Sequence, residues 1–174
     1  MFARTDRLLL RPGWGEDAPL LARTIADAAV VRNLASAPWP FALSDAEAFL
    51  AAPRDPGLPS LLIAERTLAA PRLVGACGLG RRSSGAVELG FWIARPFWGR
   101  GFATEAGEAL LEIARALRLP RLEASHFVDN PASGRVLDKL GFSDTGPATA
   151  CAGEAMTRVC QLRLAPDLEG SLAA

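Results

Sequence analysis

The chain contains 174 residues, 50% of them hydrophobic, and its 19 basic and 19 acidic side chains cancel to a formal net charge of zero. This length and composition are typical of one globular domain. The balanced charge argues against broad nucleic-acid binding, because such binding depends on an excess of cations that releases counterions from phosphates. The 3 cysteines and the single histidine fit neither a disulfide framework nor a metal site, so we expect no metal.

The beginning of the chain, residues 1–7, lacks the apolar core of a signal peptide, and no later stretch approaches the roughly 18 apolar residues of a membrane span. We therefore expect a cytoplasmic protein with no membrane partner. Glycine and proline are scattered between the elements rather than gathered in one linker. This pattern predicts a single domain over residues 1–166 and a loose C-terminal tail over residues 167–174. It leaves the oligomeric state open.

The first half of the chain predicts a strand, two helices and an antiparallel meander. Residues 7–11 form an apolar run before a proline, which is typical of a strand. Asp17 is suited to cap a helix that extends to Val30, and Ser44 and Glu47 have the spacing of a capping box for a second helix that ends at Pro53. Three apolar runs separated by turn residues then predict the meander: 61–64, 73–79 and 87–94.

The second half alternates helices and strands. Apolar residues at helical spacing predict a helix that begins at Thr104. A strand over residues 121–128 follows, and then a short helix that Asn130 caps and Gly141 ends. The remainder predicts two strands, over 148–151 and 159–162. The strand, helix, strand passage in the middle places one parallel pair in an otherwise antiparallel sheet, so the expected fold class is α/β.

The segment that joins the third strand of the meander to the next helix reads W-G-R-G-F-A-T over residues 98–104. Two glycines let successive N–H groups point into one space, and the helix N-terminus adds positive potential there, so the segment predicts an anion cradle. Arg100 is placed to add a charge to the same anion. A Walker loop is excluded because no lysine follows the glycines. A dinucleotide-binding oxidoreductase stays open as an alternative, since Glu123 lies about 20 residues further on.

A second motif, N-P-A-S-G-R-V-L-D-K-L-G-F, spans residues 130–142. Together with residues 98–106 it resembles the GNAT superfamily of N-acetyltransferases, and within it the branch that acetylates the N-termini of ribosomal proteins. The resemblance extends from about residue 7 to residue 164. It implies a mixed, mostly antiparallel twisted sheet with helices on both faces and a central parallel pair that splays to hold acetyl-CoA.

The resemblance also implies a reaction, in which the acetyl group of acetyl-CoA passes to a primary amine by direct attack within a ternary complex. The amine would belong to a protein N-terminus or to a small molecule. The pantetheine arm would pair with the backbone near Ile93 and Ala94, and the diphosphate would lie on the amides of residues 99–104. The implied cofactor-binding residues are Ile93, Ala94, Trp98, Gly99, Arg100, Gly101, Phe102, Ala103, Thr104, Asn130, Ser133 and Arg135.

The acid that protonates the departing thiolate is less obvious. Many members of the superfamily carry a tyrosine where this chain has Leu137, and the chain contains no tyrosine. In the branch that it resembles, a serine of the same helix takes that role, and Ser133 occupies the matching position. A serine in the first turn of a helix is also a common capping partner, so the structural interpretation of Ser133 stays open.

The base depends on the acceptor. An α-amino group with a pKa near 7.8 is neutral about one time in seven at pH 7, whereas lysine near 10.4 is almost fully charged, so an N-terminal amine can react with a weak base. Glu88 is the main candidate because it lies in an apolar strand and shares a face with Trp92. A solvated role for Glu88 stays open, and His126 is a second candidate.

Two further interpretations concern the acceptor and the activity itself. The loop between the first two helices carries Trp39 and Phe41, which either line the amine entrance or fill the local core. Function does not follow from fold. A non-catalytic acyl-CoA sensor on the same fold is therefore the alternative to an enzyme.

Overall fold

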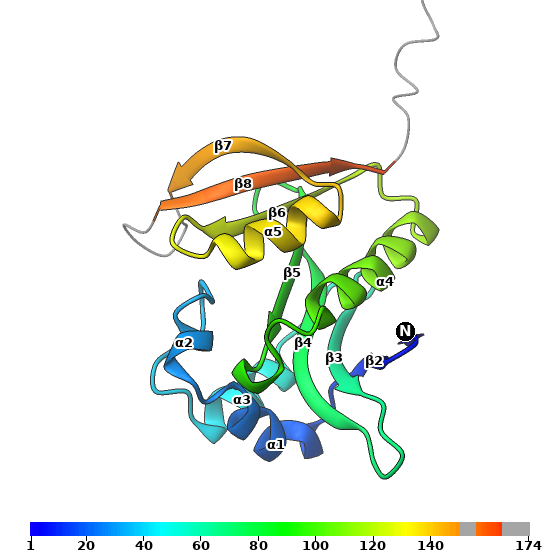
Figure 1. The fold of residues 1–174 in the computed structure, drawn as a ribbon, viewed down its shortest axis with the longest axis vertical. Helices are drawn as coiled ribbons and strands as arrows, with labels where there is room; N and C mark the ends of the chain where they lie inside the picture. The colour runs from blue at the N-terminus through cyan, green and yellow to red at the C-terminus, as the bar shows by residue number, and fades with distance from the viewer. Residues whose placement is uncertain (150–155, 165–174) are drawn as a thin grey trace, which may run out of the picture.

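An eight-stranded sheet organises the chain in the computed structural model, which describes residues 1–149 and 156–164 (Figure 1). The strands follow one another across the sheet in the order β1-β2-β3-β4-β5-β6-β8-β7. Their bounds are β1 (Ala3–Arg4), β2 (Leu8–Pro12), β3 (Ser60–Glu65), β4 (Arg72–Arg81), β5 (Val87–Ile93), β6 (Arg121–Phe127), β7 (Ser143–Thr149) and β8 (Met156–Arg163). The helices are α1 (Ala18–Ile25), α2 (Ala28–Val31), α3 (Leu43–Ala51), α4 (Phe102–Ala116) and α5 (Pro131–Lys139), with short 3-10 helices η1 (Gly15–Asp17) and η2 (Arg95–Phe97).

The pairing of β5 with β6 differs from every other pairing in the sheet. These two strands, which precede and follow the crossover helix α4 in the sequence, run parallel to each other. All other neighbouring strands are antiparallel. The register of β5 with β6 contains a single pair, Glu88 opposite Glu123. Beyond that pair the strands diverge toward their C-terminal ends (Figure 1). The predicted mixed sheet with a splayed parallel pair is thereby confirmed.

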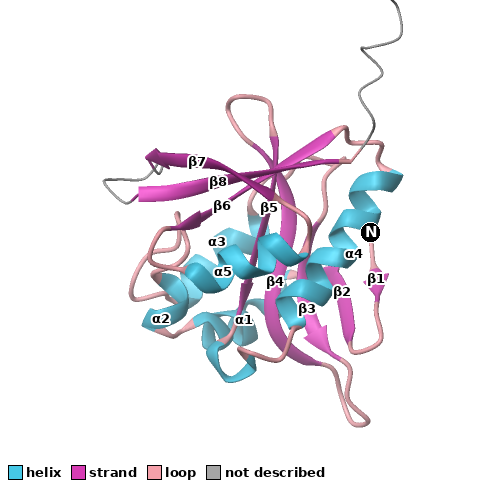
Figure 2. Ribbon diagram, turned by 45° about the horizontal axis from the view of Figure 1, so that its top comes forward, coloured by secondary structure: helices cyan, strands magenta, loops and turns pink. Residues whose placement is uncertain are grey.

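Helices cover both faces of the sheet, as the fold class predicts. Alternate residues of β3 point to opposite faces. Leu61 and Ile63 pack with α4 residues such as Leu110 in the larger core cluster. Leu62 packs on the other face against α1 and α3, through Leu21 and Ala46. Figure 2 shows α4 and α5 lying across the first of these faces.

The structure corrects the N-terminal helices. The helix predicted to run from Asp17 to Val30 ends at Ile25, and α2 begins after Asp27, whose carboxylate accepts a hydrogen bond from the N–H of Ala29 at 2.8 Å. A helical pattern of apolar residues cannot reveal this break, because both helices bury apolar residues. Asp17 does not cap α1 with its side chain, and instead binds the N–H of Trp14 and the Arg11 guanidinium.

Two other helix starts were predicted wrongly. The capping box of Ser44 and Glu47 does not form, because α3 begins one residue before Ser44. Instead, the Asp45 carboxylate accepts a hydrogen bond from the N–H of Ala42 at 2.7 Å. Helix α4 begins at residue 102, two residues before the predicted start. Of the predicted strand over 148–151, residues 148–149 end β7, and the rest lies outside the described residues, as does the predicted tail.

Candidate active site

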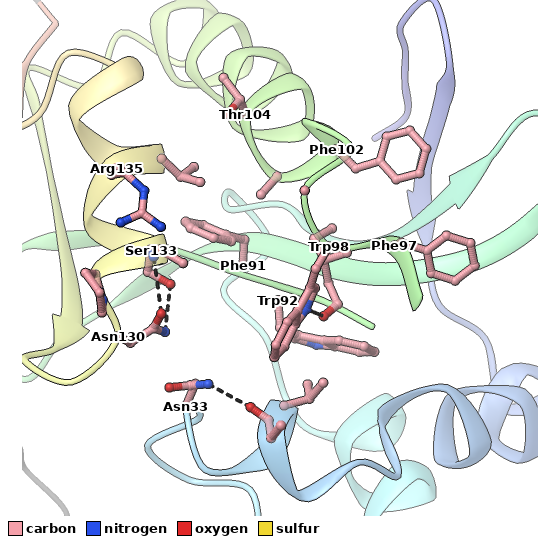
Figure 3. A pocket seen from close by; sticks show the side chains of 18 of the residues that line it. Asn33, Phe91, Trp92, Phe97, Trp98, Phe102, Thr104, Asn130, Ser133 and Arg135 are labelled. Carbon is pink, nitrogen blue, oxygen red and sulfur yellow. Dashed lines mark hydrogen bonds between the residues drawn. The ribbon is translucent and has the colours of Figure 1, made fainter. Parts of the chain in front are cut away.

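Two cavities occupy the cleft that the splayed strands leave. The first has a volume of about 610 Å³ and lies between the start of α4, α5 and α2 (Figure 3). The second, of about 530 Å³, extends among α1, α3 and the ends of β5 and β6. They share a boundary formed by six residues, Asn33, Leu34, Phe91, Trp92, Asn130 and Ser133. The cleft therefore consists of two cavities that meet beside the N-terminus of α5.

The glycine loop before α4 lines the first cavity with its backbone. Gly99 and Gly101 have φ angles of 74° and 80°, a left-handed conformation that costs other residues about 1 kcal/mol or more. Among the described residues, none of the N–H groups of residues 99–104 donates to a protein acceptor. The N-terminus of a 15-residue helix adds its dipole at the same place. These donors and the helix N-terminus are the features for which an anion cradle is predicted here.

The loop is held in place by the N-terminal segment of the chain. The Glu105 carboxylate accepts hydrogen bonds from the Thr5 hydroxyl, from the backbone N–H of Arg7 at 3.0 Å and from Arg7 Nε at 2.7 Å. Arg7 Nη1 also donates to the carbonyl oxygen of Arg100 at 2.9 Å. Burial alone would raise the pKa of Glu105, but these hydrogen bonds outweigh it and hold the pKa below its ordinary value.

Two predicted cofactor residues point elsewhere with their side chains. Arg100 does not line the cavity, because its guanidinium pairs with Glu65 at 2.7 Å and lies over the Phe102 ring at 4.7 Å. The Phe102 ring is buried and faces away from the cavity, beside Phe97 (Figure 3). Phe102 is nevertheless among the residues that line the cavity, whereas Arg100 is not. Of the other loop residues, Ala103 and Thr104 line the cavity.

The end of β5 exposes backbone groups to the cleft. The N–H of Ala94 donates to the carbonyl oxygen of Val74 at 2.8 Å, so Ala94 faces β4 and does not line the cavity. Because hydrogen-bonding directions alternate along an antiparallel strand, the backbone of Phe91 and Ile93 faces the side from which β6 has diverged. The Ile93 carbonyl accepts a hydrogen bond from Trp98 Nε1 at 2.6 Å. Within the part of the chain that the structure describes, the register between β5 and β6 does not extend to Phe91 or Ile93.

Ser133 lies where the two cavities meet, on the first turn of α5. Its backbone N–H donates to Asn130 Oδ1 at 3.3 Å, and its hydroxyl oxygen accepts from Asn130 Nδ2 at 2.9 Å. The first of these bonds settles the orientation of the amide, because an N–H can donate only to the oxygen. Asn130 therefore uses the serine oxygen as an acceptor. Asn130 thus does not take up the hydroxyl proton of Ser133.

The candidate bases line the second cavity and not the first. Glu88 Oε1 accepts from the Ser125 hydroxyl at 2.7 Å and pairs with Arg82, so the carboxylate is not in the purely apolar setting that the strand pattern suggested. His126 Nδ1 lies 2.9 Å from the Phe127 carbonyl and must donate to it, which leaves Nε2 against Gly134 of α5.

Sequence reasoning missed several lining residues. Lys139 lies one helical turn after Arg135, and both line the first cavity. Within the described part of the chain neither cation has an ion pair. Their four-residue spacing could have shown that they share a face of α5. No comparable spacing in the sequence marks Asn33 or Phe91 as lining residues. Phe41 lines the second cavity, whereas Trp39 is 58% exposed and lines neither.

The two cysteines that the structure describes do not supply a nucleophile to this site. Cys77 and Cys160 are free and buried, and neither lines a cavity. Burial raises the pKa of Cys77 to about 12 and also raises that of Cys160, so both thiols stay protonated at neutral pH. The third, Cys151, lies outside the described residues. Within residues 1–149 and 156–164, no group of acidic, cysteine and histidine side chains could hold a metal ion, and no helix could cross a bilayer.

Comparison with known proteins identifies the family. Residues 7–143 match the acetyltransferase (GNAT) domain family. The chain belongs to this family. It is 29% identical over 151 residues to the uncharacterized N-acetyltransferase p20 of Bacillus licheniformis, a match that covers 82% of each chain. The GNAT protein is accordingly an acetyltransferase.

Solved structures share its fold. A GNAT-family acetyltransferase from Bacillus anthracis superposes with a TM-score of 0.80 at 20% identity, over 94% of this chain and 99% of that one. A candidate ribosomal-protein-serine acetyltransferase from Vibrio cholerae gives a TM-score of 0.73 at 22% identity, over 94% and 97%. The latter is consistent with the branch that the sequence resembles. At these identities the likeness concerns the fold.

Proposed function

We propose that this GNAT acetyltransferase moves the acetyl group of acetyl-CoA to a primary amine by direct attack in a ternary complex. The observation that carries the proposal is the row of unsatisfied N–H groups over residues 99–104, which faces a cavity continuous with a second one at Ser133. A diphosphate suits the row of donors. The reactive end of the cofactor then reaches the point where the cavities meet.

The backbone of β5 would position the thioester. The N–H groups of Phe91 and Ile93 face the cleft, as the pantetheine amides and the developing oxyanion require. Holding the thioester beside the amine removes most of the entropic barrier to a bimolecular reaction. Trp98 supports this arrangement because its indole binds the Ile93 carbonyl and lines the first cavity.

The chemistry needs two proton movements. The amine nitrogen attacks the thioester carbonyl, the carbon–sulfur bond breaks, and the departing thiolate takes the proton of the Ser133 hydroxyl, which Asn130 leaves unengaged. The amine proton passes through water to Glu88, the base that we propose, with His126 as the second candidate in the same cavity. Proton return from Glu88 through water restores the serine. With its free thiols, the protein would work in the cytoplasm.

The test is to follow thiol release from acetyl-CoA with a mixed panel of primary amines, and to measure acetyl-CoA binding by calorimetry. We expect binding together with amine-dependent thiol release. Tight binding without release from any amine would instead identify a non-catalytic acyl-CoA sensor. Binding of NAD(P) with no preference for acetyl-CoA would identify the dinucleotide alternative.

A further inference from the structure

The second cavity carries information about the acceptor. We infer that the acceptor is a primary amine attached to an apolar body of about the size of an aromatic ring, and that this body binds in the second cavity. The inference rests on the proposed function, because it assigns the substrate of the same site. It concerns a chemical class that two sources could supply, an arylalkylamine or a peptide whose first residue is aromatic.

The lining of the second cavity is mostly rings and aliphatic side chains. Its volume of about 530 Å³ falls in the range of small-molecule sites, which are mainly apolar. Five aromatic residues from four separate segments surround it, and leucines from α1, β5 and α5 close the floor. The aromatic residues are Phe41, Phe49, Phe91, Trp92 and Phe127. An acceptor without an apolar body would leave this surface in contact with water.

The charges of the two cavities differ in sign. Arg32, Arg135 and Lys139 line the first cavity together with one carboxylate, Asp129, which pairs with Arg32. No arginine or lysine is among the described residues that line the second. Two carboxylates, Asp45 and Glu88, do line it. Phosphates therefore favour the first cavity, and an ammonium group favours the second.

The size of that negative charge limits the acceptor. Arg82 pairs with Glu88, so its charge is largely offset. Within the described residues, Asp45 has no ion pair. The Asp45 carboxylate also accepts a hydrogen bond from the N–H of Ala42 at the start of α3, so the lining holds little negative charge for more than one cation. A polyamine carries several cations, and their desolvation among aromatic rings would be uncompensated.

Exposure along the cavity shows how the acceptor enters. Leu89 and Leu137 are buried, with exposures of 2% and 1%, whereas Phe49 on α3 is 40% exposed. The cavity thus runs from an open rim at α3 to the floor beside Ser133. When the amino group of the acceptor lies at the floor, its apolar body lies among the aromatic rings. Any longer part of the acceptor then lies at the rim. Both sources of the amine fit this direction.

The experiment compares acceptors that differ only in the body that carries the amine. Thiol release from acetyl-CoA is measured with 2-phenylethylamine, ethylamine, spermidine, and two tripeptides that are identical except for Phe or Ser at the first position. We expect kcat/KM for 2-phenylethylamine and for the Phe-first peptide to exceed that of the matched ethylamine and Ser-first peptide by about tenfold or more. Whichever of the two aromatic acceptors is faster identifies the source.

Matched variants on α3 tie that preference to the cavity. Phe49→Ala removes a lining ring, and Leu43→Ala removes an apolar side chain that is 47% exposed and lines neither cavity. Phe49→Ala should raise KM for 2-phenylethylamine about fivefold more than KM for ethylamine, and Leu43→Ala should change neither. An equal effect of Phe49→Ala on both amines, or an equal effect of the two variants, overturns the inference.

The remaining outcomes separate this inference from the proposed function. Preference for spermidine or for the Ser-first peptide keeps the acetyltransferase and overturns the apolar acceptor. If no amine releases thiol, the proposed function fails. Calorimetry on the protein saturated with CoA then decides the inference: tighter binding of 2-phenylethylamine than of ethylamine supports an apolar amine site, and equal or absent binding overturns it.

Discussion

The two cavities meet at Ser133, yet they are built from different parts of the chain. The first is lined in part by the backbone of the glycine loop, in which Gly99 and Gly101 have positive φ, and we propose that its N–H groups bind the ligand. The second is lined by side chains, five of them aromatic, from segments that include α1, α3, β5 and β6. Backbone recognition depends on a few glycines at one place, and side-chain recognition depends on many residues far apart. One ligand can therefore be read from a motif, whereas the other requires the folded cleft.

The residue at the junction should give the largest effect. Ser133→Ala removes the hydroxyl proton that we propose for the thiolate, so we expect kcat to fall about 100-fold with little change in acetyl-CoA binding. The loss of its hydrogen bond to Asn130 should cost about 1 kcal/mol of unfolding free energy. Steady-state kinetics, calorimetry and urea unfolding measure the three quantities. A loss of stability with kcat within threefold of wild type would leave Ser133 with a capping role alone.

A glycine pair tests whether the first cavity recognises its ligand through the backbone. Gly99 and Gly85 both have positive φ, 74° and 85°, and a Cβ added at either meets nothing within 4 Å. Alanine at each position should therefore cost a similar 1–2 kcal/mol, roughly, in stability. Only Gly99→Ala should weaken acetyl-CoA binding, by about tenfold, because only that glycine belongs to the cradle.

Calorimetry and urea unfolding of both variants make the comparison. Equal acetyl-CoA affinities of Gly99→Ala and Gly85→Ala would contradict the backbone cradle. KM for the amine acceptor should stay the same in both variants, since neither glycine lines the second cavity.

The support beneath the cradle should give the smallest effect and a pH dependence. Glu105→Gln replaces the carboxylate that binds Thr5 and Arg7, so we expect acetyl-CoA binding to weaken about threefold. Because the pKa of Glu105 is lowered in the folded protein, its stabilisation is complete above its unfolded pKa of about 4.3 and is lost as the pH falls through the folded value.

Urea midpoints of wild type and Glu105→Gln should accordingly differ at pH 7 and converge as the pH falls from about 4.3 through the lower pKa of the folded state. Glu108→Gln on the same helix is the control, because that exposed carboxylate has no ion pair in the described part of the chain. A difference between wild type and Glu105→Gln that stays constant from pH 7 to pH 3.5 would show that the charge of Glu105 does not stabilise the fold.

Local chemistry explains why parts of the fold could be predicted. Asn130 followed by proline is a helix start whatever surrounds it, and α5 begins there. The strands of the meander were likewise located within one or two residues by their apolar runs and turn residues. The break between α1 and α2 was not, because a helical apolar pattern continues across it and Asp27 gives only a weak signal.

What the sequence alone determined is a pair of helix starts beside the first cavity: two glycines before one helix, and a capped helix with Ser133 in its first turn. Tertiary structure decided how the charges are used. It paired Arg100 with Glu65 and Glu88 with Arg82, and it assembled an aromatic cavity from segments that no spacing connects. The physical reason is the distance along the chain over which each kind of interaction acts. Turn and cap preferences act over a few neighbouring residues, whereas ion pairs and cavities exist only once distant strands and helices have packed together.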